Sequence, residues 1–451
     1  MQSTHRVVRL ASAAALAAIV AACGAPATVA TMEHPNVAGP PASAFTAQLP
    51  GSLDATIGLV RDPAITDLLT QIDPARIRHT DSMLVSFGTR NTLSDTLSAT
   101  RGIGAARRWI HSQFEQYSRD CGGCLQVSYY GKMNDFRPKR GDTTHIAVNV
   151  VDVLAWLPGR DTTHVVVMTG HYDSCICSLG GTYDSTSTAP GADDDGSGTS
   201  AIVELARVFS KQFPHGLTSS VIFAAVGAEE QGLNGSTQLA QRLHDQGYKV
   251  IAGMTDDIVG NVVAEDGTTD STSMRIFAAD PDNSPSRELG RLVWGLQRTY
   301  LPNFEVLPVW RLDRIGRGGD HEPYVTLGDA GLRFTERLEN YNRQHLPTDD
   351  FAHVNFGYIA NVARVNAMTV ATLASAPPTP AGAIAIRQDR TPVPAGGSGV
   401  PSSGGQAWTL AWFASPTAQG YELLVRRTTA PTWEQVIPLG NVTSCTLRQQ
   451  L

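Results

Sequence analysis

Strand-like apolar runs alternate with segments of helical periodicity from about residue 100 to residue 375. The strand-like runs are short, continuous and rich in β-branched residues, which is typical of strands buried on both faces of a sheet. The predicted strands cover 146–157, 164–168, 220–226, 251–259, 274–278, 304–309 and 331–335, and the predicted helices cover 105–117, 199–213, 236–246, 287–300 and 358–374. This alternation predicts an α/β fold, a three-layer α/β/α sandwich with a mostly parallel central sheet.

The composition excludes several classes of protein. Of 451 residues, 42% are hydrophobic and 17% are charged, which is too apolar for a disordered chain. The chain carries 35 basic and 42 acidic residues and has no run of Lys or Arg, so nucleic acid or an anionic membrane surface is not its expected partner. The function is therefore expected to reside in a localised binding or catalytic site. In parallel sheets such sites lie at the carboxyl ends of strands.

The first 22 residues are predicted to be an export signal. Basic residues precede an Ala-rich apolar run that is too short for a permanent membrane helix. The run ends at Cys23 in a pattern that resembles a bacterial lipobox, in which the cysteine becomes lipidated. An ordinary signal peptide cleaved elsewhere is the alternative. The protein is thus expected in the periplasm, on the outer membrane as a lipoprotein, or outside the cell, with membrane contact only through lipid on Cys23.

The remaining chain divides by composition. Residues 23–50 are rich in Ala, Pro and Thr and predict a flexible tether, while 51–375 predict the main domain, with 51–96 as a helical cap or N-terminal extension. Residues 376–405 form a Pro, Gly and Ser linker. Residues 406–451 predict a small β segment that resembles the early strands of a fibronectin type III module, but is too short for about seven strands.

Four cysteines form two close pairs along the chain. The pairs are Cys121 with Cys124 and Cys175 with Cys177, and an oxidising compartment would allow disulfides within or between these loops. A zinc site built from all four is the alternative, although a spacing of one residue is tighter than the usual two to four or so between zinc ligands. Cys445 remains without an assigned partner.

Carboxylates and imidazoles follow the predicted strands. His171 and Asp173 come at the end of one strand, and the run of three aspartates from 193 to 195 leads into the next helix. One negative charge suits a helix N-terminus, but three adjacent carboxylates repel one another unless a cation holds them. A bound divalent metal ion is the simplest explanation of this run.

Two more strands end in acidic pairs. Glu229 and Glu230 follow one strand, Asp256 and Asp257 follow another, and His345 comes after the last predicted strand. Neighbouring residues at a strand end point in different directions, so one of a pair can bind metal while the other faces a substrate. Five or six oxygen and nitrogen ligands without thiolate suit two zinc ions that share one carboxylate.

These segments together resemble the ordered motifs of the zinc-dependent exopeptidases of clan MH. That group includes bacterial leucyl aminopeptidases, glutamate carboxypeptidases and glutaminyl cyclases. The resemblance covers residues 100 to 375 and rests on four motifs in the same order: Gly-His-Tyr-Asp-Ser at 170–174, Gly-Ala-Asp-Asp-Asp-Gly-Ser-Gly at 191–198, Ala-Glu-Glu-Gln-Gly-Leu-Asn-Gly-Ser at 228–236 and His-Leu-Pro-Thr-Asp-Asp at 345–350.

The resemblance implies a role for each motif residue. His171 would bind one zinc ion, Asp194 would bridge two, and Glu230 and His345 would bind the other. Asp257 is the best match for the fifth ligand, and Asp256 is the alternative. A cis peptide bond would join Asp194 to Asp195.

Other residues would support the ligands. Asp173 and Asp195 would lie beside the ligands without binding metal, and Asp173 would orient His171. Glu229 would act as the catalytic base. Asp320 and His321 resemble a substrate-pocket motif of the aminopeptidases, but the residue before Asp320 is glycine where the family usually has serine.

The expected function is an exported aminopeptidase with two zinc ions. The ligand types alone do not select zinc, because manganese or cobalt suits the same ligands. The choice of zinc is what the resemblance implies. A carboxypeptidase of the same fold is an alternative, with a basic pocket drawn from Arg311, Arg314, Arg317, Arg333 and Arg337. A glutaminyl cyclase or a catalytically inactive binding module are further alternatives. Peptides are the expected substrates.

Overall fold

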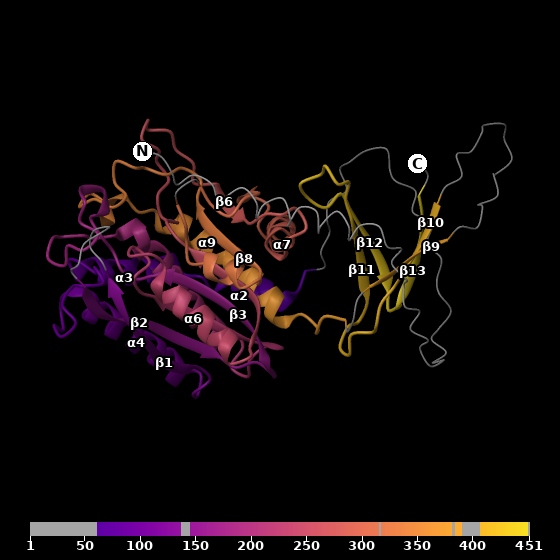
Figure 1. Ribbon diagram of the computed structural model, residues 1–451, viewed down its shortest axis with the longest axis horizontal. Helices are drawn as coiled ribbons and strands as arrows, with labels where there is room; N and C mark the ends of the chain where they lie inside the picture. Colours follow the sequence, from indigo (N-terminus) through magenta and orange to yellow (C-terminus); the bar gives the residue numbers. More distant parts are fainter. Residues whose placement is uncertain (1–60, 137–144, 315–316, 381–383, 390–405, 450–451) are drawn as a thin grey trace, which may run out of the picture. The chain divides into compact units, whose positions relative to one another are not determined.

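The computed structural model describes residues 61–136, 145–314, 317–380, 384–389 and 406–449. The predicted signal and tether lie outside the described residues, as does much of the predicted linker. The described chain forms one large sheet covered by helices, followed by smaller antiparallel sheets (Figure 1). Among the described residues, no helix is both long enough and apolar enough to span a bilayer.

An eight-stranded sheet forms the centre of the main domain. Its strands are β1 (Gln126–Phe136), β2 (Ile146–Leu157), β3 (Asp161–His171), β4 (Ser219–Val226), β5 (Lys249–Asp256), β6 (Ser273–Ala278), β7 (Glu305–Val309) and β8 (Gly331–Glu336), in the spatial order β1-β2-β4-β3-β5-β8-β6-β7. The run β4-β3-β5-β8 is parallel, as is β6 with β7. The strands β1, β2 and β6 add antiparallel pairs. The predicted α/β sandwich with a mostly parallel sheet is confirmed.

Helices cover both faces of this sheet. On β3, Val166 and Met168 belong to a large apolar cluster with helices α2 (Pro63–Thr70), α3 (Pro74–Ser86), α4 (Gly102–Asp120), α5 (Gly198–Gln212), α7 (Pro285–Tyr300) and α9 (Phe356–Ser375). Val165 and Val167 belong to a second cluster with α6 (Asn234–Asp245) and α8 (Glu322–Thr326). Successive side chains of a strand point to opposite faces, so the continuous apolar run of β3 fills both layers.

Two short helices occupy part of the segment expected to be a cap. Both α2 and α3 begin with an Asp-Pro pair, and the Asp62 and Asp73 side chains accept backbone hydrogen bonds two residues on. Such N-caps satisfy free amides, while proline suits the first helical position. Ile65 and Leu84 are buried in the large apolar cluster, so these helices pack into the main domain.

The C-terminal strands form a three-stranded sheet and a two-stranded ribbon. The first contains β9 (Ala385–Asp389), β10 (Gln406–Ala411) and β13 (Ser444–Gln449), and the second contains β11 (Tyr421–Val425) and β12 (Gln435–Gly440). The likeness of this segment to a fibronectin type III module stays a prediction. The described cysteines form disulfides within their own loops, Cys121–Cys124 and Cys175–Cys177, and Cys445 is free and buried.

Candidate metal centre

Four neighbouring parallel strands end at one edge of the sheet, and the predicted site residues lie there. His171 is the last residue of β3 and is in register with Val226, the last residue of β4. Asp256 ends β5, and Glu229 and Glu230 follow β4 by three and four residues. Because parallel strands bring their carboxyl ends to a common edge, residues separated by long stretches of sequence meet in one site.

Asp194 lies between the two predicted histidine ligands. Its Oδ1 is 3.1 Å from His171 Nε2, and its Oδ2 is 2.9 Å from His345 Nε2. Glu230 Oε2 is 3.3 Å from His345 Nε2, and Asp257 Oδ1 is 3.9 Å from His171 Nε2. The side chains thus form two groups that meet at Asp194, which is the arrangement a carboxylate bridging two ions would require.

The two adjacent aspartates after β5 point in different directions. Asp257, with His171 and Asp194, offers ligand atoms that all lie within 4.8 Å of one another. Asp256 is fully buried and accepts a hydrogen bond from Asn366 of α9. The structure therefore brings Asp257 to the site and turns Asp256 away from it.

The donor atoms of this centre fit metal ions. His171 Nε2 and Glu230 Oε1 are buried atoms that no hydrogen bond satisfies. Burial raises the pKa of Glu230 well above its usual value, and the charge of Asp194 adds to this rise. Burial opposes ionisation of Asp194 too, but His345 and His171 hold its pKa well below its usual range. Closely placed carboxylates and unsatisfied imidazole nitrogen are the features that divalent zinc stabilises.

A cavity of about 310 Å³ opens on this centre. It is lined by Asp194, Glu229, Glu230, Gly232, Leu233, Asp257, Arg317, Gly318, Arg333 and His345. The Glu229 carboxylate accepts no hydrogen bond from a described residue, and burial raises its pKa well above the usual value of a glutamate. A carboxyl of this kind can exchange a proton with water or substrate at closer to neutral pH than an ordinary glutamate.

Backbone strain is concentrated at the same site. Four non-glycine residues of the described chain have a positive φ, namely Ala228 (57°), Leu233 (58°), Ile258 (52°) and His345 (56°). Ala228 precedes the glutamate pair, Leu233 lines the cavity, Ile258 follows Asp257, and His345 is itself a predicted ligand. Such conformations are costly for residues with a side chain and collect where function fixes the backbone. The predicted cis bond between Asp194 and Asp195 is confirmed.

Two predicted neighbours of the ligands hold the backbone of the site. Asp173 accepts hydrogen bonds from the amides of Glu229 (3.1 Å) and Glu230 (3.3 Å), and its own carbonyl lies 3.2 Å from His171 Nδ1. Asp195 accepts a hydrogen bond from the His171 amide at 3.0 Å. Asp173 therefore positions both the histidine and the glutamate pair.

Two further supporting residues were not assigned from the sequence. Asp349 accepts hydrogen bonds from the amides of Asp193 (2.9 Å) and Asp194 (3.0 Å). Because it lies four residues after His345 in the same motif, its proximity could have been inferred. Arg90, from the segment predicted to be a helical cap or N-terminal extension, is fully buried and donates to three backbone carbonyls in the loops around the site, those of Tyr172, Pro190 and Gly191. Nothing in the sequence around Arg90 signals this role.

Two arginines of the predicted basic set reach the cavity wall. Arg333 is buried and binds two carboxylates, those of Asp257 and Asp313, each at 2.9 Å. Arg317 is part-buried, and no described residue hydrogen-bonds or ion-pairs with its guanidinium. Arg333 therefore holds a predicted ligand in place, while the charge of Arg317 is available to the cavity.

Asp320 and His321 lie in the protein interior. Both are fully buried, Asp320 accepts a hydrogen bond from Ser236, and His321 Nε2 is 2.9 Å from the Leu312 carbonyl. Neither is among the described residues that line the cavity. From their segment the cavity wall takes Arg317 and Gly318 instead, so a role for Asp320 and His321 in a substrate pocket stays a prediction.

Comparisons with known proteins place this geometry in context. The family model described as peptidase family M28 matches residues 152–370, a range that contains every predicted ligand. A probable zinc metalloprotease of Pyricularia oryzae is 34% identical over 453 residues, covering 93% of this chain and 84% of that protein.

Solved structures share the fold. The Legionella pneumophila LapA aminopeptidase superposes with a TM-score of 0.54 and 23% identity, covering 69% of this chain and 75% of that one. A Porphyromonas gingivalis glutaminyl cyclase superposes with a TM-score of 0.51 and 16% identity, covering 66% of this chain and 97% of that one. At such identities the likeness speaks for the fold alone.

Proposed function

The chain belongs to peptidase family M28 and is a zinc metallopeptidase, and from this premise we propose that it is a two-zinc aminopeptidase that removes N-terminal residues from peptides. The observation that carries the proposal is Asp194, whose two carboxylate oxygens face two different histidines at 3.1 Å and 2.9 Å. His171, Asp194 and Asp257 would hold one ion, and Asp194, Glu230 and His345 the other.

The charge of the cavity supports a free N-terminus as the group recognised. Four carboxylates, those of Asp194, Glu229, Glu230 and Asp257, line its wall. Two dications would offset the four negative charges, so Glu229, the one of the four that is not a proposed ligand, is the carboxylate left to attract the α-ammonium of a peptide. The LapA neighbour of the same fold is named an aminopeptidase.

The catalytic step follows from the placement of Glu229. Zinc ions bound at this centre supply an activated water near neutral pH and polarise the scissile carbonyl. Glu229 lines the cavity beside the ligands, accepts the proton of the attacking water, and donates it to the departing amine. Asp173 fixes the Glu229 amide, and therefore the position of this base.

Hydrolysis of a panel of amino-acid p-nitroanilides tests the proposal, with N-blocked peptides alongside. We expect release only from free N-termini, abolished by a chelator. Glu229→Gln should lower kcat about 10²- to 10⁴-fold while the metal content is unchanged. The matched control is Glu115→Gln, an exposed glutamate on α4, which should retain full activity. Hydrolysis of blocked peptides from the C-terminus, or none at all with metal bound, would contradict the proposal.

A carboxypeptidase is the second candidate, and Arg317 is the observation that favours it. Its guanidinium lies on the cavity wall, pairs with no residue that the structure describes, and could bind a terminal carboxylate. In that case Arg317→Gln would raise KM for N-blocked peptides and leave amino-acid p-nitroanilides unaffected. A glutaminyl cyclase is less favoured, because the approach of His171 and Asp257 to Asp194 supplies ligands for a second ion.

We also propose that the protein acts outside the cytoplasm, with lipid on Cys23 as a membrane anchor. The two disulfides support an oxidising compartment. Cell fractionation and the mass of the mature N-terminal peptide test this: a lipidated Cys23 supports the anchor, and cleavage elsewhere leaves only export.

A further inference from the structure

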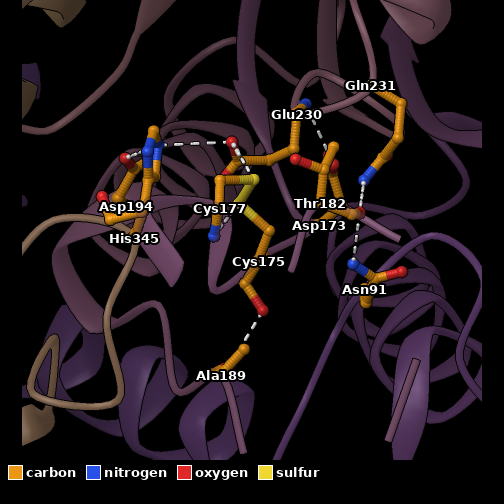
Figure 2. The surroundings of a disulfide bond; sticks show 12 residues. Asn91, Asp173, Cys175, Cys177, Thr182, Ala189, Asp194, Glu230, Gln231 and His345 are labelled. Carbon is orange, nitrogen blue, oxygen red and sulfur yellow. Dashed lines mark hydrogen bonds and ion pairs between the residues drawn. A yellow bond between two sulfur atoms is a disulfide. The ribbon is translucent and has the colours of Figure 1, made fainter. Parts of the chain in front are cut away.

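The Cys175–Cys177 disulfide lies against one half of the candidate metal centre. Cys177 Sγ is 3.7 Å from Glu230 Oε2. Cys175 Sγ and the ligand atoms of Glu230 and His345 all lie within 4.8 Å of one another. Figure 2 shows the disulfide between these two side chains and the loop that carries Ala189. Sulfur is therefore within reach of an ion held by Glu230 and His345.

The oxidation state of the sulfur determines whether it can bind the metal ion. A thiolate is a strong zinc ligand, whereas a sulfur bonded to another sulfur is not. With the disulfide intact, the chain offers Asp194, Glu230 and His345 to this ion. Three protein ligands and one open position are typical of catalytic zinc, and four protein ligands are typical of structural zinc.

We propose that the disulfide keeps the fourth coordination position of this ion open, and that its reduction adds Cys175 to Asp194, Glu230 and His345 in a closed metal site that lacks peptidase activity. The inference rests on the proposed function only for its effect on activity. It assigns to Cys175 a metal-binding role in the dithiol state, with zinc or cobalt as the ion.

The difference in burial between the two cysteine residues favours coordination by Cys175. Cys175 is 4% exposed, while Cys177 is part-exposed. A reductant therefore attacks Cys177 Sγ and releases the Cys175 sulfur beside Glu230 and His345. With a trialkylphosphine, the S–S bond breaks, water supplies the oxygen of the phosphine oxide, and its two protons leave two thiols. The Cys175 thiol then loses its proton to solvent as the S–metal bond forms.

The second disulfide provides a matched control. Cys121 and Cys124 follow the C-terminal end of α4. Among the described residues, neither belongs to a group of potential metal ligands. Its reduction should consume phosphine without altering the metal centre.

Cobalt spectroscopy of the full chain tests the inference. Co²⁺-loaded protein is measured before and after phosphine treatment, for absorption and for p-nitroanilide hydrolysis. We expect reduction to produce a thiolate-to-cobalt charge-transfer band in the near ultraviolet together with loss of most activity. Both changes should reverse on reoxidation with a disulfide such as oxidised glutathione.

Single-cysteine variants identify which sulfur binds the metal ion. Cys177→Ser should show the band and low activity without reductant, and Cys175→Ser should show no band and an activity that phosphine does not change. The Cys121→Ser, Cys124→Ser double variant should respond like the wild type. Absence of the band in reduced wild type and in Cys177→Ser, with the thiols titrated as free, would overturn the inference. If the oxidised protein hydrolyses no peptide, the proposed function fails, and the cobalt band still decides the role of Cys175.

Discussion

Two sets of buried carboxylates meet at the edge of the sheet, and they are held in opposite ways. The cavity carboxylates, Asp194, Glu230 and Asp257, face imidazoles or a guanidinium. The supporting carboxylates, Asp152, Asp173, Asp195 and Asp349, accept hydrogen bonds from backbone amides of the loops that carry the cavity residues. The same chemical group is thus a proposed metal ligand in one region and a backbone anchor in the other.

The difference shows what each region needs from its surroundings. Carboxylates gathered around one cavity repel one another unless cations lie between them, so the first set is expected to depend on bound metal. A carboxylate that accepts two amide hydrogen bonds is already satisfied without metal, so the second set depends on the fold. Metal content should therefore respond to changes in the first region, and loop position or stability to changes in the second.

Asp194→Asn is expected to have the largest effect. The variant loses the one group shared by both halves of the centre, so we expect kcat/KM to fall about 10³-fold or more and both ions to be lost. His345→Ala should lose only one ion, because His171, Asp194 and Asp257 remain together. The number of bound metal ions and kcat/KM are measured for both variants. If Asp194→Asn retained two ions, the proposal that the cavity carboxylates differ from the supporting carboxylates in binding metal would be wrong.

Arg90→Met tests the supporting region by stability. Its guanidinium donates to three buried carbonyls, so its removal leaves them unsatisfied and should lower the free energy of unfolding by about 3 kcal/mol. Arg101 donates to the same loop region from an exposed position, and Arg101→Met should cost about 0.5 kcal/mol. Urea unfolding of the metal-free variants measures both, and equal losses would contradict the role of burial.

Asp173→Asn should lower activity without removing metal. One oxygen of Asp173 faces the amide of Glu229 and the other that of Glu230, so an amide side chain would place its NH₂ against one of these donors. We expect a loss of about 10- to 100-fold in kcat/KM. Asp350→Asn, an exposed change in the His345 motif, is the control and should be silent. Unchanged kinetics in Asp173→Asn would show that the glutamate pair holds its position without this anchor.

Asp152→Asn should have the smallest effect and one that depends on pH. Burial raises the pKa of Asp152 to about 7, against about 3.9 in an unfolded chain. Between these values the folded protein binds more protons, so its stability falls as pH rises from about 4 to about 7. The variant has no carboxyl at this position and should not lose stability in this way as pH rises. Its new side-chain amide can also donate a hydrogen bond to Gln238 Oε1, which otherwise has no partner among the described residues.

Unfolding at pH 6 and pH 8 measures this difference. At pH 8 we expect the variant to be about 1.4 kcal/mol more stable than the wild type, relative to pH 6. Asp245→Asn alters a similar aspartate beside Gln241 on the exposed face of α6 and should show no pH dependence. The same pH dependence in the variant and the wild type would show that Asp152 is ionised in the folded protein.

Much of the fold was accessible from the sequence. The predicted strand at 164–168 lies within β3, and the predicted helix at 358–374 lies within α9, because long periodic or continuous apolar runs are strong local signals. The boundaries were less accurate, since the strand predicted at 251–259 ends at Asp256. The antiparallel pairing of β2 with β4 has no local signal and follows from how the chain crosses the sheet.

The sequence by itself determined which ligand types are present and in what order, because each motif is a short local run that follows a recognisable strand. Only the tertiary structure decided which of the two aspartates after β5 faces the cavity, since Asp256 turns to Asn366 and Asp257 to His171. It also decided that Arg90 anchors the loops and that a disulfide lies beside Glu230. These contacts join segments distant in sequence, and packing alone selects them.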